Sequence, residues 1–353
     1  MNLLGDHALR RAASSRLVPS GPGMRRLMIV LAVAALIGVD AAPALAGGTA
    51  NPWLKRRVLN IAHQGGEDEF PSNTLYAFRK AIRAGADMLE LDVGVTSDNQ
   101  VVVMHDTSVD RTTNGTGLIS EKTLQEIQGL DAGYWFTPDG SNHYSHDLEV
   151  GSYPFRGVAT GERRPPKGFK AADFRVPTLR SVLRSFPNTP INIEVKGRTK
   201  EEDTAEYVYN AEVLGRELAG VNRDDLIMTS FQQPAIDRFH ELAPRIGNSP
   251  GVSGVAGWVL DGTAPPSGTV AFQIPITFKL GATVYDVTSA DNVSRAHGER
   301  YAVHTWFGDL DTDDAQTWRK LVDDCVDGIM TSHPVQLERT LKLHRAPRAC
   351  AAK

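Results

Sequence analysis

Apolar segments of strand length alternate with longer amphipathic segments along the chain after residue 47. The apolar segments are typical of buried strands and occupy residues 58–63, 88–93, 101–105, 191–195, 226–230, 270–274, 301–305 and 328–330. The amphipathic segments predict helices over residues 74–84, 201–218, 233–242, 289–300, 313–323 and 335–343. A repeated strand-then-helix order indicates parallel strands joined by crossover helices, and eight such units close into a barrel. We therefore predict an α/β fold, a TIM (β/α)8 barrel, in which residues 245–266 remain unassigned.

Residues 131–177 interrupt this alternation, since they are rich in Gly, Pro, Tyr and charged residues and show no long periodicity. The segment 101–105 before them is predicted to be the return arm of a hairpin with the second strand. The interruption therefore falls between the second and third barrel strands. We expect an inserted loop region there, over one end of the barrel, because long loops in compact enzymes are often functional lids.

The N-terminal region has the pattern of a secretion signal. Met24-Arg25-Arg26 begins a basic stretch, residues 27–39 are almost wholly apolar, and Ala44-Leu45-Ala46 has the small-x-small form that signal peptidase accepts. The apolar run is shorter than the roughly 20 residues that a membrane span needs. We predict a signal peptide over residues 24–46, cleaved after Ala46, and a secreted or extracytoplasmic protein without a stable membrane anchor. Residues 1–23 are an extended n-region or precede the true start, and an uncleaved anchor is the alternative.

Composition and charge narrow the class of protein. Hydrophobic residues make up 41% and charged residues 23% of 353, which is ordinary for a globular protein, and a net charge of −4 provides no basic field for nucleic acid. The expected organisation is an N-terminal extension with signal peptide (1–46), one barrel domain (47–345) and a tail (346–353). Cys325 and Cys350 could pair in an oxidising compartment or remain two free thiols.

Two histidines end predicted strands, at the face where TIM-barrel active sites are built. His63 ends the first strand before a glycine pair, and His105 ends the segment 101–105. Two histidines close to one substrate can act as general acid and general base. Each histidine taken alone is also compatible with a structural role.

Glu90 and Asp92 are expected to share one face of a buried strand, with a solvent-exposed edge strand as the alternative, and Glu194 can complete a metal site of three carboxylates. Side chains alternate along a strand with a period of two, so Glu90 and Asp92 point the same way, as do Glu194 and Lys196. Buried carboxylates repel one another unless a cation or a base compensates, and oxygen ligands suit Mg2+ or Ca2+. Lys196 could stabilise a phosphoryl oxygen, or form an ion pair with Glu194 on a solvated strand.

The motifs and their order resemble the glycerophosphodiester phosphodiesterase family over residues 58–342. The matching segments are His63-Gln64-Gly65, Pro71-Ser72-Asn73-Thr74, Gly85-Ala86-Asp87, Glu90-Leu91-Asp92-Val93, His105-Asp106, Arg111-Thr112-Thr113-Asn114-Gly115-Thr116-Gly117, Glu194-Val195-Lys196, His304-Thr305-Trp306 and Asp327-Gly328-Ile329-Met330-Thr331. The resemblance implies hydrolysis of glycerophosphodiesters to glycerol 3-phosphate and an alcohol. It also implies that His63, His105 and Lys196 are catalytic, and that one divalent cation, Ca2+ or Mg2+, is held by Glu90, Asp92 and Glu194.

The substrate site is expected to involve three further residues. Gln64 and Asn73 are expected to line the phosphate site, and Trp306 to pack beside the glycerol or leaving group or else in the core. The family has Arg in place of Gln64 and Glu in place of Ser72, so one cation of the phosphate site is absent here. The two departures could be coupled, because losing both members of an ion pair leaves no unpaired charge.

Two other functions remain compatible with the sequence. One is a lysophospholipase D acting on lysophospholipids, in which aromatic residues of the insertion shelter an acyl chain: Tyr134, Trp135, Phe136, Tyr144, Tyr153 and Phe155. The other is a non-catalytic, metal-bearing binding protein, which only the departures at Gln64 and Ser72 favour. In each case the expected partner is a small molecule and not a nucleic acid.

Overall fold

The fold is a ring of parallel strands surrounded by helices in a computed structural model, which describes residues 51–54, 57–138, 144–201, 203–348 and 350. The predicted signal peptide and its cleavage site lie outside the described residues. Eight parallel strands follow one another in the order β6-β5-β4-β2-β1-β11-β10-β7. Their bounds are β1 (Leu59–Ala62), β2 (Met88–Val95), β4 (Ile191–Val195), β5 (Leu226–Thr229), β6 (Gly247–Asn248), β7 (Ala271–Pro275), β10 (Ala302–Trp306) and β11 (Gly328–Thr331).

The ring closes between β6 and the segment that leads into β7. The Asn248 N–H donates to the Gly268 carbonyl, and the Val270 N–H donates to the Asn248 carbonyl, both at 2.9 Å. The predicted TIM (β/α)8 barrel is therefore confirmed. The strand that the sequence left unassigned is β6, which consists of two residues and is too short to show a hydrophobic pattern.

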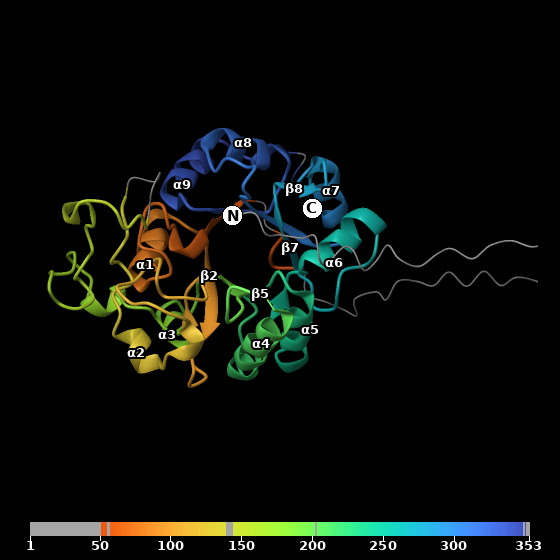
Figure 1. The fold of residues 1–353 in the computed structure, drawn as a ribbon. Helices are drawn as coiled ribbons and strands as arrows, with labels where there is room; N and C mark the ends of the chain where they lie inside the picture. Colours follow the sequence, from red (N-terminus) through yellow and green to blue (C-terminus); the bar gives the residue numbers. More distant parts are fainter. Residues whose placement is uncertain (1–50, 55–56, 139–143, 202, 349, 351–353) are drawn as a thin grey trace, which may run out of the picture. The chain divides into compact units, whose positions relative to one another are not determined.

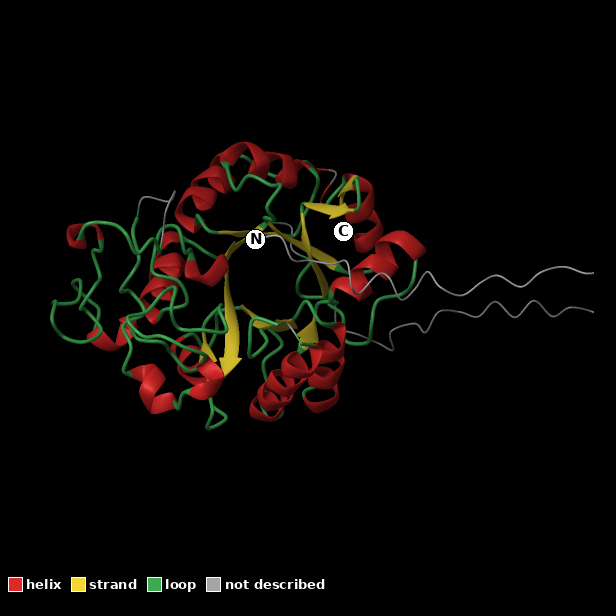
Figure 2. Cartoon of the chain, in the orientation of Figure 1, coloured by secondary structure: helices red, strands yellow, loops and turns green. Residues whose placement is uncertain are grey.

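Helices cover the outside of the ring, as Figures 1 and 2 show. The described helices are α1 (Leu75–Ala84), α2 (Leu124–Gln128), α3 (Leu179–Ser185), α4 (Thr204–Leu218), α5 (Gln233–Leu242), α6 (Val252–Ala256), α7 (Ala290–Gly298), α8 (Ala315–Asp323) and α9 (Pro334–Leu343). The short helices α2, α3 and α6 were not predicted, because five to seven residues hold at most two turns of periodicity. None of the described helices is long and apolar enough to cross a membrane.

Helix α1 shows how local sequence sets the boundaries of an element next to the site. The Thr74 hydroxyl accepts a hydrogen bond from the Ala77 N–H, which caps the first turn. Gly85 ends the helix with φ 111°, a left-handed conformation that glycine adopts at little cost. The buried face of the helix includes Phe78, which packs against the outer side of the sheet.

Several apolar clusters hold the sheet and its helices together, of which two lie next to the strands of the site. Outside the ring, buried residues of β2, β4 and β5 pack against helices α3, α4 and α5. A smaller cluster on the strands β1, β2, β5 and β11 includes Ile61, Met88, Ile227 and Met330.

The segment after β2 departs from the simple barrel pattern. Strand β3 (Val101–Val103) runs antiparallel to β2, as expected for a return arm, but ends before Met104 and His105. Between β3 and β4 lie residues 131–177, where the described part has no strand and two 3-10 helices, η3 (Val150–Ser152) and η4 (Ala171–Phe174). Figure 2 shows this part mostly as loop.

Besides the barrel, the described residues form a small sheet of two strands that was not predicted. Strands β8 (Thr277–Leu280) and β9 (Thr283–Asp286) form an antiparallel hairpin directly after β7. The hairpin exposes Phe278, Val284 and Tyr285. Sequence reasoning missed it because each strand has only four residues, too few for its pattern to stand out from a loop.

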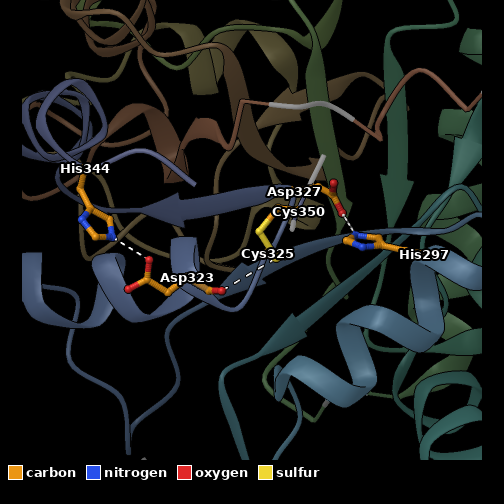
Figure 3. Close-up of a disulfide and its surroundings, with 6 residues drawn as sticks. All are labelled: His297, Asp323, Cys325, Asp327, His344 and Cys350. Atoms are coloured by element: carbon orange, nitrogen blue, oxygen red, sulfur yellow. Dashed lines mark hydrogen bonds and ion pairs between the residues drawn. A yellow bond between two sulfur atoms is a disulfide. The ribbon is translucent and has the colours of Figure 1, made fainter. Parts of the chain in front are cut away.

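The C-terminal tail is tied to the barrel by a disulfide. Cys325, which follows α8, is bonded to Cys350, with 5.3 Å between the two Cα atoms (Figure 3). Of the two possibilities that the sequence left open, the structure contains the paired form. Two ion pairs lie nearby, His297 with Asp327 and His344 with Asp323.

Candidate active site

Five of the predicted site residues lie on or directly after three adjacent strands, β1, β2 and β4. Strand β2 lies between β1 and β4, and Asp92 is paired in register with Glu194. His63 follows the last residue of β1, and Lys196 follows the last residue of β4. Residues that are more than 130 positions apart in the sequence thus share one end of the barrel.

Three carboxylates form the centre of this site. One oxygen each from Glu90, Asp92 and Glu194 lies within 4.8 Å of the others. Glu90 and Asp92 are fully buried, and Oε1 of Glu90 has no hydrogen-bond partner among the described residues. A buried carboxylate oxygen without a donor is costly, and a bound cation removes this cost. The three residues therefore fit a single divalent cation with oxygen ligands.

The pKa values of the carboxylates also indicate that the site is suited to a bound cation. Burial raises the pKa of Glu90 well above its usual range, and the neighbouring charge of Asp92 adds to the effect. Burial also favours the neutral form of Asp92, but the ammonium of Lys196 and the other groups around the carboxylate together outweigh it and lower the pKa to about 2. A cation between the carboxylates would favour the ionised form of both.

Lys196 lies directly beside this cluster. Its Nζ is 3.1 Å from Oδ1 of Asp92 and 2.5 Å from Oε1 of Glu194. Burial lowers the pKa of Lys196, but the charges of Asp92 and Glu194 outweigh this and raise it above its usual value. The ion pair with Glu194 is thus present, and it lies inside the site and not on a solvated strand.

His63 begins the 3-10 helix η1 (His63–Gly65) and faces the carboxylates. Its Nδ1 is 2.5 Å from Oε1 of Glu67, and its Nε2 is 3.9 Å from Oε2 of Glu90. Burial opposes the charged imidazolium, but Glu67 and Glu90 outweigh burial and raise the pKa of His63 to about 10 in the absence of a cation. A divalent cation bound at Glu90 would oppose this rise.

His105 is held by an acidic partner as well. Its Nδ1 is 2.8 Å from Oδ1 of Asp106, and Arg111 donates two hydrogen bonds to the same carboxylate, at 2.7 and 3.0 Å. Burial alone would raise the pKa of Asp106, but the bonds to His105 and Arg111 lower it far below its usual value. The positive charge of His105 also contributes to the low pKa of Asp92.

The turn after β1 carries the two departures from the family motif, and they are in contact. The Ser72 hydroxyl donates to Oε1 of Gln64 at 2.6 Å, and both residues are buried. The Gln64 main-chain N–H donates to Oε2 of Glu90 at 2.8 Å, with Gln64 at φ 49°. The Ser72 N–H in turn donates to the Tyr144 hydroxyl at 2.5 Å. Positions 64 and 72 therefore form a neutral hydrogen-bonded pair, which agrees with the expected coupling.

The two other predicted substrate residues lie in different surroundings. Asn73 donates its side-chain N–H to Oδ2 of Asp92 at 3.0 Å, so in this structure it contacts a carboxylate of the cluster. Trp306 is half-buried at the end of β10, and its ring lies 5.8 Å from the ring of Phe231. The Lys196 ammonium lies 5.8 Å from the same Phe231 ring, which places Trp306 on the Lys196 side of the site.

Sequence reasoning missed several residues of this site. Glu67 and Phe231 lie in loops and have no strand position that would single them out. Gln273 was also missed, although it lies on β7 inside the ring and donates to Oδ1 of Asn192 at 2.9 Å. A polar residue at an alternating position of an otherwise apolar strand is the signal that could have identified Gln273.

Comparisons with known proteins identify the family. The model of the glycerophosphoryl diester phosphodiesterase family matches residues 63–336. A glycerophosphodiester phosphodiesterase of Bacillus subtilis is 28% identical over 306 residues, which are 85% of this chain and 92% of that protein. One of Caldanaerobacter subterraneus is 51% identical over 193 residues, which are 54% of this chain and 65% of that protein, so the matched part is just under two thirds of that relative.

Solved structures share the fold. The glycerophosphoryl diester phosphodiesterase domain of a Mycobacterium tuberculosis protein has a TM-score of 0.58 at 18% identity and covers 82% of this chain and 100% of that one. An Oleispira antarctica phosphodiesterase in complex with the product sn-glycerol-3-phosphate has a TM-score of 0.54 at 22% identity and covers 80% of this chain and 96% of that one. Because the family model covers most of the barrel, the chain belongs to the glycerophosphoryl diester phosphodiesterase family of phosphoric diester hydrolases.

Proposed function

We propose that this protein hydrolyses glycerophosphodiesters to glycerol 3-phosphate and an alcohol with the help of one divalent cation, Ca2+ or Mg2+. The observation that carries the proposal is the cluster of the buried Glu90 and Asp92 with the partly buried Glu194. It has a histidine beside it and a Glu90 oxygen that accepts no hydrogen bond from the residues that the structure describes. These three residues would hold the cation. When bound, it supplies positive charge to a non-bridging phosphate oxygen.

The other residues of the site stabilise charge on the phosphate, transfer protons and position the substrate. Lys196, beside the carboxylates, adds positive charge at the same phosphate group. One of His63 and His105 removes a proton from the attacking hydroxyl, and the other protonates the leaving alcohol. The attacking hydroxyl belongs to water or to C2 of the glycerol, which would give a cyclic phosphate first. The neutral Gln64 lines the phosphate site, Asn73 orients Asp92, and Trp306 packs beside the glycerol.

The direct test is hydrolysis of glycerophosphocholine by the chain from residue 47, first treated with EDTA and then supplied with Ca2+ or Mg2+. We expect EDTA to abolish activity and one of the cations to restore release of both glycerol 3-phosphate and choline. A matched variant is Glu194→Gln, which keeps the size of the side chain and removes one ligand charge. Full activity in EDTA, or in Glu194→Gln without added cation, would contradict the proposal.

A lysophospholipase D activity is the second candidate. A human relative named lysophospholipase D GDPD1 is 36% identical over 144 residues, which are 40% of this chain. The insertion aromatics Phe136, Tyr144 and Tyr153 are buried, so they are less suited to shelter an acyl chain than the sequence suggested. The exposed apolar hairpin β8–β9 follows the C-terminal end of β7, at the same end of the barrel as the site.

A substrate panel separates the two activities. Glycerophosphocholine and lysophosphatidylcholine have the same headgroup and differ in one acyl chain. Preference for the acylated substrate, lost on replacing Phe278 and Tyr285 with Ser, would favour the lipid activity. If the purified chain binds cation but turns over neither substrate, the non-catalytic binding protein is favoured instead.

We also propose that the protein is secreted after cleavage at Ala46. The support is the order of basic, apolar and small residues over positions 24–46. N-terminal sequencing of the protein from the producing cell's medium or envelope is expected to begin at Gly47. Recovery of a membrane-bound form that retains residues 27–39 would favour the uncleaved anchor.

A further inference from the structure

Glu67 is a buried carboxylate beside His63 that does not belong to the cation cluster. It lies four residues after His63, and Gly66 turns the chain between them with φ 89°. A Cβ on Gly66 would lie 2.6 Å from Cγ of Pro334, so the turn is packed too closely for any other residue. The tight turn returns the chain so that the Glu67 carboxylate reaches the imidazole.

The contact uses one specific nitrogen of the ring. Oε1 of Glu67 lies 2.5 Å from Nδ1 of His63, and Nε2 of the same ring lies 3.9 Å from Glu90 on the cluster side. A carboxylate can only accept, so Nδ1 carries the hydrogen in this contact. The nitrogen on the cluster side is therefore Nε2.

Glu67 is itself held in place. The Ser332 hydroxyl donates to its Oε1 at 2.9 Å, and Ser332 follows β11. The side chain of Glu67 is 10% exposed, so water cannot replace it easily at His63. Ser332, which follows β11, thus anchors Glu67, and Glu67 in turn fixes the orientation of the His63 imidazole.

His105 has the corresponding contact with Asp106 through its own Nδ1, at 2.8 Å. Asp106 belongs to the motif His105-Asp106, which is one of the segments that resemble the family. Glu67 lies outside all of these segments. The two histidines thus have the same arrangement, in which a carboxylate holds Nδ1 and leaves Nε2 for the reaction. Such a partner fixes the tautomer and the direction of a catalytic imidazole.

We propose that Glu67 is the positioning residue of His63, which holds the proton on Nδ1 and directs Nε2 at the phosphodiester. This inference rests on the proposed function. Glu67 does not contact the reacting atoms, so its replacement should lower kcat and leave KM for the substrate nearly unchanged. Loss of a comparable supporting carboxylate costs about 10- to 100-fold in activity.

The variants are Glu67→Gln and Glu67→Ala, with Glu69→Gln as the matched control. Glu69 lies two residues further on, and its carboxylate accepts from the Val335 N–H, not from a histidine of the site. We expect glycerophosphocholine hydrolysis to lose about 10- to 100-fold in kcat in Glu67→Ala, less in Glu67→Gln, and almost nothing in Glu69→Gln. Wild-type kcat in both Glu67 variants would overturn the proposal.

A double-mutant cycle distinguishes positioning from a general effect on the fold. In the His63→Ala background, Glu67→Gln should cause no further loss of kcat, because the side chain that it orients is gone. Residual rates are measured with an activated p-nitrophenyl phosphodiester, whose leaving group needs little protonation. If the two losses multiply, Glu67 supports the fold and not His63, and the proposal fails.

A spectroscopic measurement keeps this test independent of the activity. In 15N-labelled protein, the Nδ1 proton of His63 should be visible and shifted downfield, lost in Glu67→Ala and unchanged in Glu69→Gln. An inactive wild type that shows this proton would reject the proposed function but not the contact. Absence of the proton in an active wild type would reject the positioning role.

Discussion

The site combines a cluster of like charges with two histidines whose Nδ1 atoms are both held by carboxylates. The roles assigned to the two histidines make a direct prediction at the scale of single residues. His63→Ala and His105→Ala should each lower kcat by about 100- to 10,000-fold, since each removes one proton transfer. Cation binding, measured by calorimetry, should persist because neither histidine is one of the three carboxylates.

The matched control for these variants is His344→Ala. His344 lies 2.9 Å from Asp323 near the chain's C-terminus and outside the site (Figure 3). It should retain wild-type kcat. Near-normal turnover in both His63→Ala and His105→Ala would show that acid–base catalysis resides in other groups.

Because Gln64 and Ser72 are in contact, we expect substitutions at the two positions to have coupled effects on stability. Gln64→Arg alone places a cation, and Ser72→Glu alone an anion, in a buried pair that is now neutral. Each single change should lower the free energy of unfolding by about 3 kcal/mol, and the double variant should recover much of this loss as the two charges pair. Urea unfolding of the four proteins measures the coupling, and additive losses would contradict it.

At the scale of elements, the start of helix α9 carries a charge-dependent contact. His333 precedes Pro334, and its Nε2 lies 3.1 Å from Oδ2 of Asp68. The hydrogen bond with Asp68 raises the pKa of His333, and the charges of Asp313 and Glu69 add to this against the effect of burial. The protonated form is therefore favoured in the folded protein.

This shift predicts how stability depends on pH. Because the folded pKa lies above the unfolded value near 6.5, the stabilisation is complete below that pH and is lost as pH rises through the folded pKa. The variant His333→Gln should lose on the order of 1 kcal/mol relative to wild type at about pH 5.5, and less at about pH 9. Urea unfolding at both pH values measures the difference, and a loss that grows toward high pH would contradict this sign.

At the scale of the whole molecule, the disulfide closes a loop that contains β11, α9 and part of the tail. Cys325 and Cys350 are 25 positions apart, and the bond restricts the unfolded chain. Cys350→Ser should lower the free energy of unfolding by about 3 kcal/mol, and dithiothreitol should lower that of the wild type similarly. The double variant with Cys325→Ser should match the single one, whereas a wild type insensitive to reductant would contradict a stabilising bond.

The strand-then-helix order and the chemistry at the strand ends were determined by the sequence itself. Hydrophobic runs such as that of β2 and caps such as Thr74 act over a few residues, so their effect can be predicted locally. The period of two along β2 is by itself enough to place Glu90 and Asp92 on one face of the sheet. These local rules were sufficient for the strand-then-helix order and for the shared face of Glu90 and Asp92, whereas the place of Glu194 beside them depends on the pairing of β4 with β2.

Other features were decided only by the tertiary structure, because they depend on contacts between distant segments. The two-residue strand β6 exists because its neighbours in the closed ring supply hydrogen bonds, and not because of its own pattern. Glu67 acquires its place at His63 through the turn at Gly66 and the anchor from Ser332, 265 positions away. The pairing of Gln64 with Ser72 likewise required folding, since a sequence shows which residues changed but not whether they touch.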